Sequence, residues 1–142
     1  MSNVKAGLGI LQAASKDIED GYLTTLEKMV VAEVFSDLLD QADHLLKHGY
    51  YIPAASLTGA ILENGLRALA KQKNIPVKTK DNLTTLNNKL AAKNTYSRLR
   101  QKQVAVWIDV RNAADHGEFA KVTKNDVAEL VRGVQNFLAE ET

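Results

Sequence analysis

The chain has no cysteine, two prolines and eight glycines among its 142 residues. Without cysteine it has no disulfide, thiolate metal site or cysteine nucleophile. No apolar run approaches the roughly 18 residues that a membrane-spanning helix needs, and no signal peptide is indicated at the amino terminus. We therefore expect a cytoplasmic protein without membrane association.

Positive and negative charges nearly cancel, because 18 Lys and Arg face 17 Asp and Glu, for a net charge of +1. Proteins that coat nucleic acid without selectivity carry a strong basic excess. Any contact with nucleic acid is therefore expected to be local. Hydrophobic residues make up 45% of the chain, which is enough to fill one core.

Apolar residues recur at three and four positions and alternating strand patterns are scarce, which predicts an all-α protein. We expect one domain over residues 1–142, an up-and-down helical bundle of about four main helices plus a short helix. Residues 1–20 are expected to be either a separate helical arm or an extension of the first long helix, with Gly21 as a break or kink. The main helices are expected from Tyr22 to Leu46, Pro53 to Lys73, Ser97 to Ala114 and Thr123 to Leu138, with the short one around Leu83 to Leu90.

Capping signals mark several expected helix starts. Ser2 or Asn3 can cap a first helix, and Ser97 and Thr123 can cap the last two main helices. Asp126 lies three residues after Thr123 and completes an acidic variant of the capping box.

The stretch Trp107–Phe119, with the sequence WIDVRNAADHGEF, concentrates polar chemistry at a helix end, where Gly117 is a stop signal. Asn112 and His116 are four positions apart and share a helix face. Arg111 and His116 are five apart, about 140° around the helix, and do not. We expect Arg111 either to reach His116 through its length or to meet it across a second chain.

A guanidinium beside an imidazole suits phosphodiester chemistry. Arginine can hold phosphate oxygens and neutralise charge in the transition state, and histidine can move a proton near neutral pH. On RNA the 2′-hydroxyl is a built-in nucleophile, so no cofactor is expected. The structural alternative is that the arginine forms a salt bridge and the histidine complements the helix dipole.

The segment RNAADH fits the R-x4-H form of the R-x4–6-H motif and resembles HEPN domains, with the polar Asn112 directly after Arg111. The earlier segment HGYYIPAASLTGAILENGLRALA is similar to the preceding helix pair of HEPN-like families. The T-x-x-D-V start of the last helix fits as well, so the resemblance covers about Phe35 to Leu138. One antitoxin-paired subgroup has a Tyr shortly after the His, and here Phe119 lies near that place.

The resemblance implies a HEPN-like bundle that forms a homodimer through the motif helix, so that two Arg/His sets line one cleft. It implies a metal-independent endoribonuclease that cleaves single-stranded RNA by 2′-hydroxyl attack, in a defence or toxin–antitoxin setting, with an antitoxin or other protein as partner. By this resemblance Arg111 binds phosphate, His116 transfers the proton and Asn112 orients them.

Some members of the family are non-catalytic modules for nucleotide binding, RNA binding or assembly, which is the alternative function. Arg111 and His116 opening onto a common cleft of two chains would favour the enzyme. Arg111 held in a buried ion pair would favour the module.

Three carboxylates near the motif are open to two interpretations each. Glu63 can be an acidic member of the site or the partner of Arg67 at i, i+4. Asp109 can tune His116 or bond Arg111, or it is a solvated carboxylate. Asp115 is expected at the surface.

Arg98, Arg100 and Lys102, with Lys93 and Tyr96 just before them, form a modest basic cluster upstream of the motif. The cluster is expected either to contact the RNA backbone or to be a solvated helix face.

His44 and His48 have the i, i+4 spacing of two metal ligands, but no third strong ligand is apparent, so no metal is expected. Trp107 is expected to pack in the core or in a dimer interface rather than to stack on a base.

Overall fold

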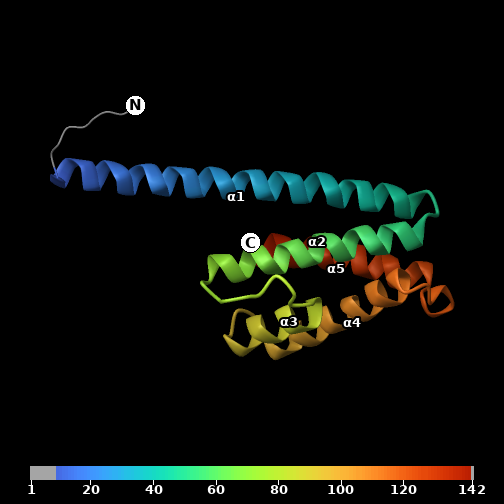
Figure 1. Ribbon diagram of the computed structural model, residues 1–142. Coiled ribbons are helices and arrows are strands. Elements are labelled where there is room, and N and C mark those ends of the chain that lie inside the picture. Colours follow the sequence, from blue (N-terminus) through green and yellow to red (C-terminus); the bar gives the residue numbers. More distant parts are fainter. Residues whose placement is uncertain (1–8, 142) are drawn as a thin grey trace. The chain divides into compact units, whose positions relative to one another are not determined.

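The computed structural model describes residues 9–141, and every element in this range is a helix. Figure 1 shows the chain order of these elements. They are α1 (Gly9–Lys47), α2 (Tyr51–Gln72), α3 (Leu83–Ala92), α4 (Arg98–Asp115), the 3-10 helix η2 (Phe119–Lys121) and α5 (Lys124–Glu141). The prediction of an all-α bundle with one short α-helix is confirmed. None of these helices combines the length and apolarity needed to cross a membrane.

Helix α1 runs through Gly21 without a break. Residues 9–20 therefore extend the long helix, which is the second of the two expected alternatives. The expected caps at Ser2 or Asn3 lie outside the described residues. The chain divides into two compact units, residues 1–35 and 36–142, so the division falls inside α1.

The core of the second unit is built around α2, which contacts α3, α4 and α5. In Figure 1, α2 and α5 run side by side, with α3 and α4 next to them. Ten residues of α2 are buried, and at 100° per residue they cover about half of the circumference of this helix. The largest fully buried side chains of the unit are Phe137, Ile61, Leu62, Leu66, Leu69, Leu83, Leu86, Leu90, Leu130, Val104, Val127 and Val134.

The predicted caps of the later helices are confirmed. The Ser97 hydroxyl accepts a hydrogen bond from the Arg100 N–H at 3.0 Å and starts α4. At the start of α5, Thr123 Oγ1 accepts from the Asp126 N–H and the Asp126 carboxylate accepts from the Thr123 N–H, both at 3.0 Å. This reciprocal pair satisfies two N–H groups that a helix start leaves open.

Two large apolar residues of α4 are not in the core. Leu99 is 69% exposed and Val106 is 59% exposed, whereas Val104 and Trp107 of the same helix are buried. Leu99 and Val106 are seven apart and lie on one side of the helix. The face of α4 that they share has no covering element among the described residues.

A buried amide holds α3 and α4 together. Asn87 is 2% exposed, and its Nδ2 donates to the carbonyl oxygen of Gln101 at 3.0 Å. Its Oδ1 accepts from the hydroxyl of Tyr96, in the connecting turn, at 2.7 Å. These two hydrogen bonds join α3 to the start of α4 and to the turn between them.

Candidate functional site

His116 ends α4 at the predicted place. It is the C-cap residue, and Gly117 adopts a left-handed conformation with φ +76°. The Glu118 N–H then donates to the carbonyl oxygen of Ala113 at 2.8 Å, which closes the helix end. The His116 side chain is exposed and forms no hydrogen bond or ion pair with any residue that the structure describes. It is therefore free to meet a ligand.

Asn112 lies one turn before His116 and is half-buried. Its side-chain amide also has no hydrogen-bond partner in the described part of the chain. The two residues share one side of α4, as predicted from their spacing.

Arg111 lies against α2. Its aliphatic stem lies on Gly59, where a Cβ would come within 1.9 Å of Arg111 Cγ and 2.8 Å of Cδ. The missing side chain at Gly59 thus makes the space that the arginine stem occupies. Arg111 keeps only 19% of its side chain exposed.

The guanidinium of Arg111 forms an ion pair with Asp115, from Nη1 to Oδ2 at 3.2 Å. Asp115 is itself held by the hydroxyl of Ser56 on α2, which donates to Oδ1 at 2.5 Å. The Nε of Arg111 is buried without a hydrogen-bond partner, and Nη2 makes no hydrogen bond to a described residue. The arginine is fixed in place, but only Nη1 of its three nitrogens is in use.

Among the described residues, the His116 side chain takes no part in the contacts of Arg111 with Asp115 and Gly59, in agreement with the 140° separation of Arg111 and His116. The part-buried ion pair of Arg111 is of the kind that favours a non-catalytic module. Arg111 and Asp115 form one hydrogen bond, whereas a guanidinium and a carboxylate often form two. A cleft shared by two chains stays a prediction.

Glu63 is engaged by Arg67, whose Nε and Nη2 donate to its carboxylate at 3.3 and 3.2 Å. The same guanidinium also donates to backbone carbonyls of the α2–α3 loop. The i, i+4 pair is thus the interpretation that is observed for Glu63, and no contact with Arg111 or His116 accompanies it among the described residues.

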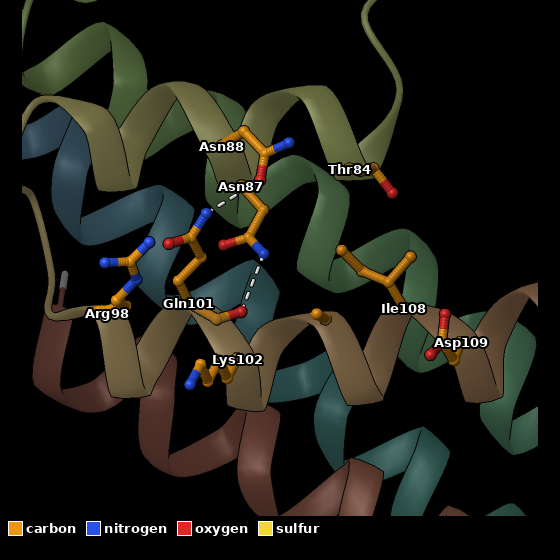
Figure 2. A pocket seen from close by; sticks show the side chains of 9 residues that line it. Thr84, Asn87, Asn88, Arg98, Gln101, Lys102, Ile108 and Asp109 are labelled. Carbon is orange, nitrogen blue, oxygen red and sulfur yellow. Dashed lines mark hydrogen bonds between the residues drawn. The ribbon is translucent and has the colours of Figure 1, made fainter.

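Asp109 lines a groove between α3 and α4 and forms no ion pair with a described residue. Figure 2 shows this groove, with Asp109 beside Ile108 towards one end and Arg98 at the other. Asn87, Asn88 and Gln101 lie between them. Asp109 bonds neither Arg111 nor His116, so the solvated carboxylate is the alternative that is observed.

The predicted basic cluster separates into two kinds of residue. Arg98 and Lys102 are exposed and line the α3–α4 groove. Arg100 forms an ion pair with Glu140 and lies over the ring of Phe137, with Cζ 5.4 Å from its centroid. Tyr96 is 7% exposed. Arg98 and Lys102 are therefore available to a ligand, whereas Arg100 and Tyr96 are structural.

His44 and His48 have rings 4.1 Å apart, and His48 Nδ1 lies 2.9 Å from the His44 carbonyl oxygen. Trp107 is a core residue, as expected, since its ring lies 5.9 Å from that of Phe137 at 70°. Gly133 makes room for this ring, because a Cβ there would come within 2.4 Å of it.

Three neighbours of Arg111 were not assigned to the site from the sequence. Asp115 is exposed, as expected, but it also pairs with Arg111, and the i, i+4 spacing is a signal for this pair. Ser56 and Gly59 lie on another helix more than 50 positions away, where no spacing rule connects them to the motif.

Searches against protein-family models, curated proteins and solved structures find no match for this chain.

Proposed function

We propose that the protein is a metal-independent endoribonuclease of the HEPN type that cleaves single-stranded RNA. The carrying observation is the free imidazole of His116, one turn from the free amide of Asn112, at an exposed helix end. Arg111 supports it with a fixed guanidinium that still has unused donors. The motif itself, R-x4-H at the end of the penultimate long helix, links these residues to the HEPN resemblance.

The proposed reaction is an internal transfer on RNA. The 2′-oxygen attacks the adjacent phosphorus while the bond from phosphorus to the 5′-oxygen breaks. This yields a 2′,3′-cyclic phosphate and a free 5′-hydroxyl. His116 takes the proton from the 2′-hydroxyl, and the departing 5′-oxygen gains a proton from a second imidazole or from water. Arg111 offsets the charge on the phosphate oxygens, and Asn112 orients the phosphate.

A second copy of the chain is part of this proposal. Arg111 lies against α2 and is held by Asp115, whereas His116 is exposed and takes no part in these contacts, so we infer that one chain does not place both groups on one phosphate. Two motif helices packed side by side can present the arginine of one copy beside the histidine of the other. The setting that we propose is defence or toxin–antitoxin, with a second protein restraining the activity.

The test is cleavage of single-stranded RNA by purified protein with a chelator present. His116→Ala is expected to lower the rate at least about 100-fold, which is the usual contribution of a general acid–base group. Arg111→Ala is expected to lose about 100- to 1,000-fold, as for a group that stabilises the transition state. His48→Ala and Arg132→Ala are matched controls, because both residues are exposed and lie outside the motif. Equal cleavage by both motif variants would sink the proposal.

The ion pair between Arg111 and Asp115 favours a second candidate, a non-catalytic HEPN-like module for nucleotide or RNA binding or for assembly. In such a module Arg111 has a structural role, because it joins α4 to α2, and it does not bind the phosphate of a ligand. This candidate predicts no cleavage at any protein concentration, and RNA binding that survives His116→Ala. Cleavage that depends on His116 would exclude it.

A further inference from the structure

The positive charge of this chain is concentrated in one segment. Ten of the 18 Lys and Arg, but only one of the 17 Asp and Glu, lie between Arg67 and Lys102. This quarter of the sequence has a formal charge of +9, and the remainder has −8. The segment covers the end of α2, the α2–α3 loop, α3, the α3–α4 turn and the start of α4. We call this region the basic end.

Three of the ten cations form ion pairs within the chain. Arg67 pairs with Glu63, Lys89 with Asp81 and Arg100 with Glu140. The other seven are exposed and form no ion pair with a described residue. They are Lys71, Lys73, Lys78, Lys80, Lys93, Arg98 and Lys102. The basic end therefore presents positive charge that the described part of the chain does not neutralise.

Hydrogen bonds from Arg67 and Lys89 hold the α2–α3 loop in place. Arg67 donates to the carbonyl oxygens of Lys78 at 3.2 Å, Thr79 at 3.3 Å and Asp81 at 2.6 Å. Lys89 bonds the Asp81 carboxylate at 2.6 Å. The backbone N–H of Lys78 and then Lys89 lower the pKa of Asp81, so the carboxylate stays charged. The outer lysines of the loop thus extend from a backbone that needs little ordering when a ligand binds.

Two grooves bring the cations together. One lies where α2 and α3 end, and is lined by Lys73–Pro76 on one side and Lys93–Thr95 on the other. The second is the α3–α4 groove, with Arg98, Lys102 and the side-chain amides of Asn88 and Gln101 (Figure 2). Each groove therefore holds two exposed cations together with neutral polar groups, and the α3–α4 groove also has the carboxylate of Asp109 towards the end away from Arg98.

Helix stability alone explains only part of this arrangement. Lys73 and Lys93 lie at helix C-termini, where a cation complements the dipole. Arg98 is the first residue of α4, where a cation opposes the dipole. Lys80 lies just before the Asn82 cap of α3 and is unfavourable for the same reason. Cations therefore lie both at helix C-termini, where they stabilise the helix, and at helix N-termini, where they do not. The second group is better explained by binding of an anionic ligand.

We propose that the basic end binds the sugar–phosphate backbone of RNA. Its grooves hold no exposed aromatic side chain, since Tyr96 is buried, so they offer neither a stacking platform for bases nor the aromatic anchor typical of protein interfaces. Backbone contacts position a nucleic acid without reading its sequence. This inference rests on the proposed function for the choice of RNA, and it does not need the motif to be catalytic.

The test is fluorescence anisotropy with a labelled single-stranded RNA of roughly 20 nucleotides, at salt concentrations between about 50 and 200 mM. The full chain carries His116→Ala, so that cleavage does not affect the signal. Two double variants remove one groove each, Lys73→Gln with Lys93→Gln and Arg98→Gln with Lys102→Gln. Lys124→Gln with Arg132→Gln is the matched control, because it removes the same charge from exposed, unpaired residues of α5.

Each groove variant is expected to weaken binding and to reduce the slope of log affinity against log salt by about 1.4, or about 0.7 per lost phosphate contact. The control is expected to keep the slope of the parent. Equal slopes in the parent and both groove variants would overturn the proposal, as would equal losses in the control. Competition by polyglutamate as effective as that by unlabelled RNA would also overturn it, since the surface would then be an acidic-protein site. The effect of the motif variants on cleavage is a separate result, because binding is measured in a protein that already carries His116→Ala.

Discussion

Arg111 is the residue whose role the structure changes most. The HEPN resemblance implies that Arg111 binds phosphate. The structure adds that the stem of Arg111 fills the space above Gly59 and that Asp115 holds its Nη1. An arginine placed in this way joins two helices even where no ligand is bound. Packing and phosphate binding are therefore coupled at this position, and variants of Arg111 need a stability measurement beside the activity measurement.

Gly59→Ala tests this packing. The new Cβ would overlap Arg111 Cγ, and overpacking of this kind costs about 1–3 kcal/mol in unfolding free energy. In an Arg111→Ala background the same change is expected to be neutral or stabilising, since alanine is favoured over glycine in a helix by up to about 1 kcal/mol. Urea unfolding of the two single variants and the double variant gives the coupling. An equal cost of Gly59→Ala in both backgrounds would contradict the contact.

At the scale of the elements, the sequence predicts most helix ends because those signals are local. Ser97, Thr123 and Gly117 each act within four residues, through a cap or a left-handed turn. Contacts between helices are not local, so Ser56 and Gly59 could not be assigned to the motif. The exposure of Val106 on α4 was also unpredictable, because it depends on which neighbours cover the helix.

Tyr96, in the turn between α3 and α4, is expected to make the stability of the fold depend on pH in the alkaline range. Burial, with a smaller contribution from Glu141, raises the pKa of Tyr96 above its ordinary value of 10.0. The folded state therefore keeps the phenol proton where the unfolded state loses it. This contribution to stability is fully present below about pH 10 and falls as the pH rises further.

Tyr96→Phe is expected to remove that alkaline component. At neutral pH it costs about 1–3 kcal/mol, because the buried Asn87 Oδ1 loses the hydroxyl that donates to it. Urea unfolding of both proteins between about pH 8 and 11 measures the two effects. The same decline in stability above pH 10 in the variant would show that Tyr96 does not titrate in this way.

For the molecule as a whole, the proposed cleavage reaction requires a second copy of the chain. Leu99 and Val106 leave an exposed apolar face on α4, the helix that carries the motif. We expect this face to form the dimer contact, as the HEPN resemblance implies. A homodimer through α4 would also join the two motif ends into one site.

Val106→Glu is expected to convert the dimer into a monomer in sedimentation analysis and to abolish cleavage. Val34→Glu on α1 is the matched control, since Val34 is 48% exposed and lies in the first unit. Dissociation by Val34→Glu but not by Val106→Glu would place the contact on α1 and contradict the shared cleft. A monomeric parent protein that cleaves RNA would contradict the requirement for a second copy.

The chemistry of the cleaved RNA ends, formed with EDTA present, tests the proposed reaction of Arg111 and His116. We expect 2′,3′-cyclic phosphate and 5′-hydroxyl ends from the parent protein and no such products from His116→Ala. Products that end in a 3′-hydroxyl, or cyclic phosphate formed equally by the His116 variant, would contradict the role given to this motif.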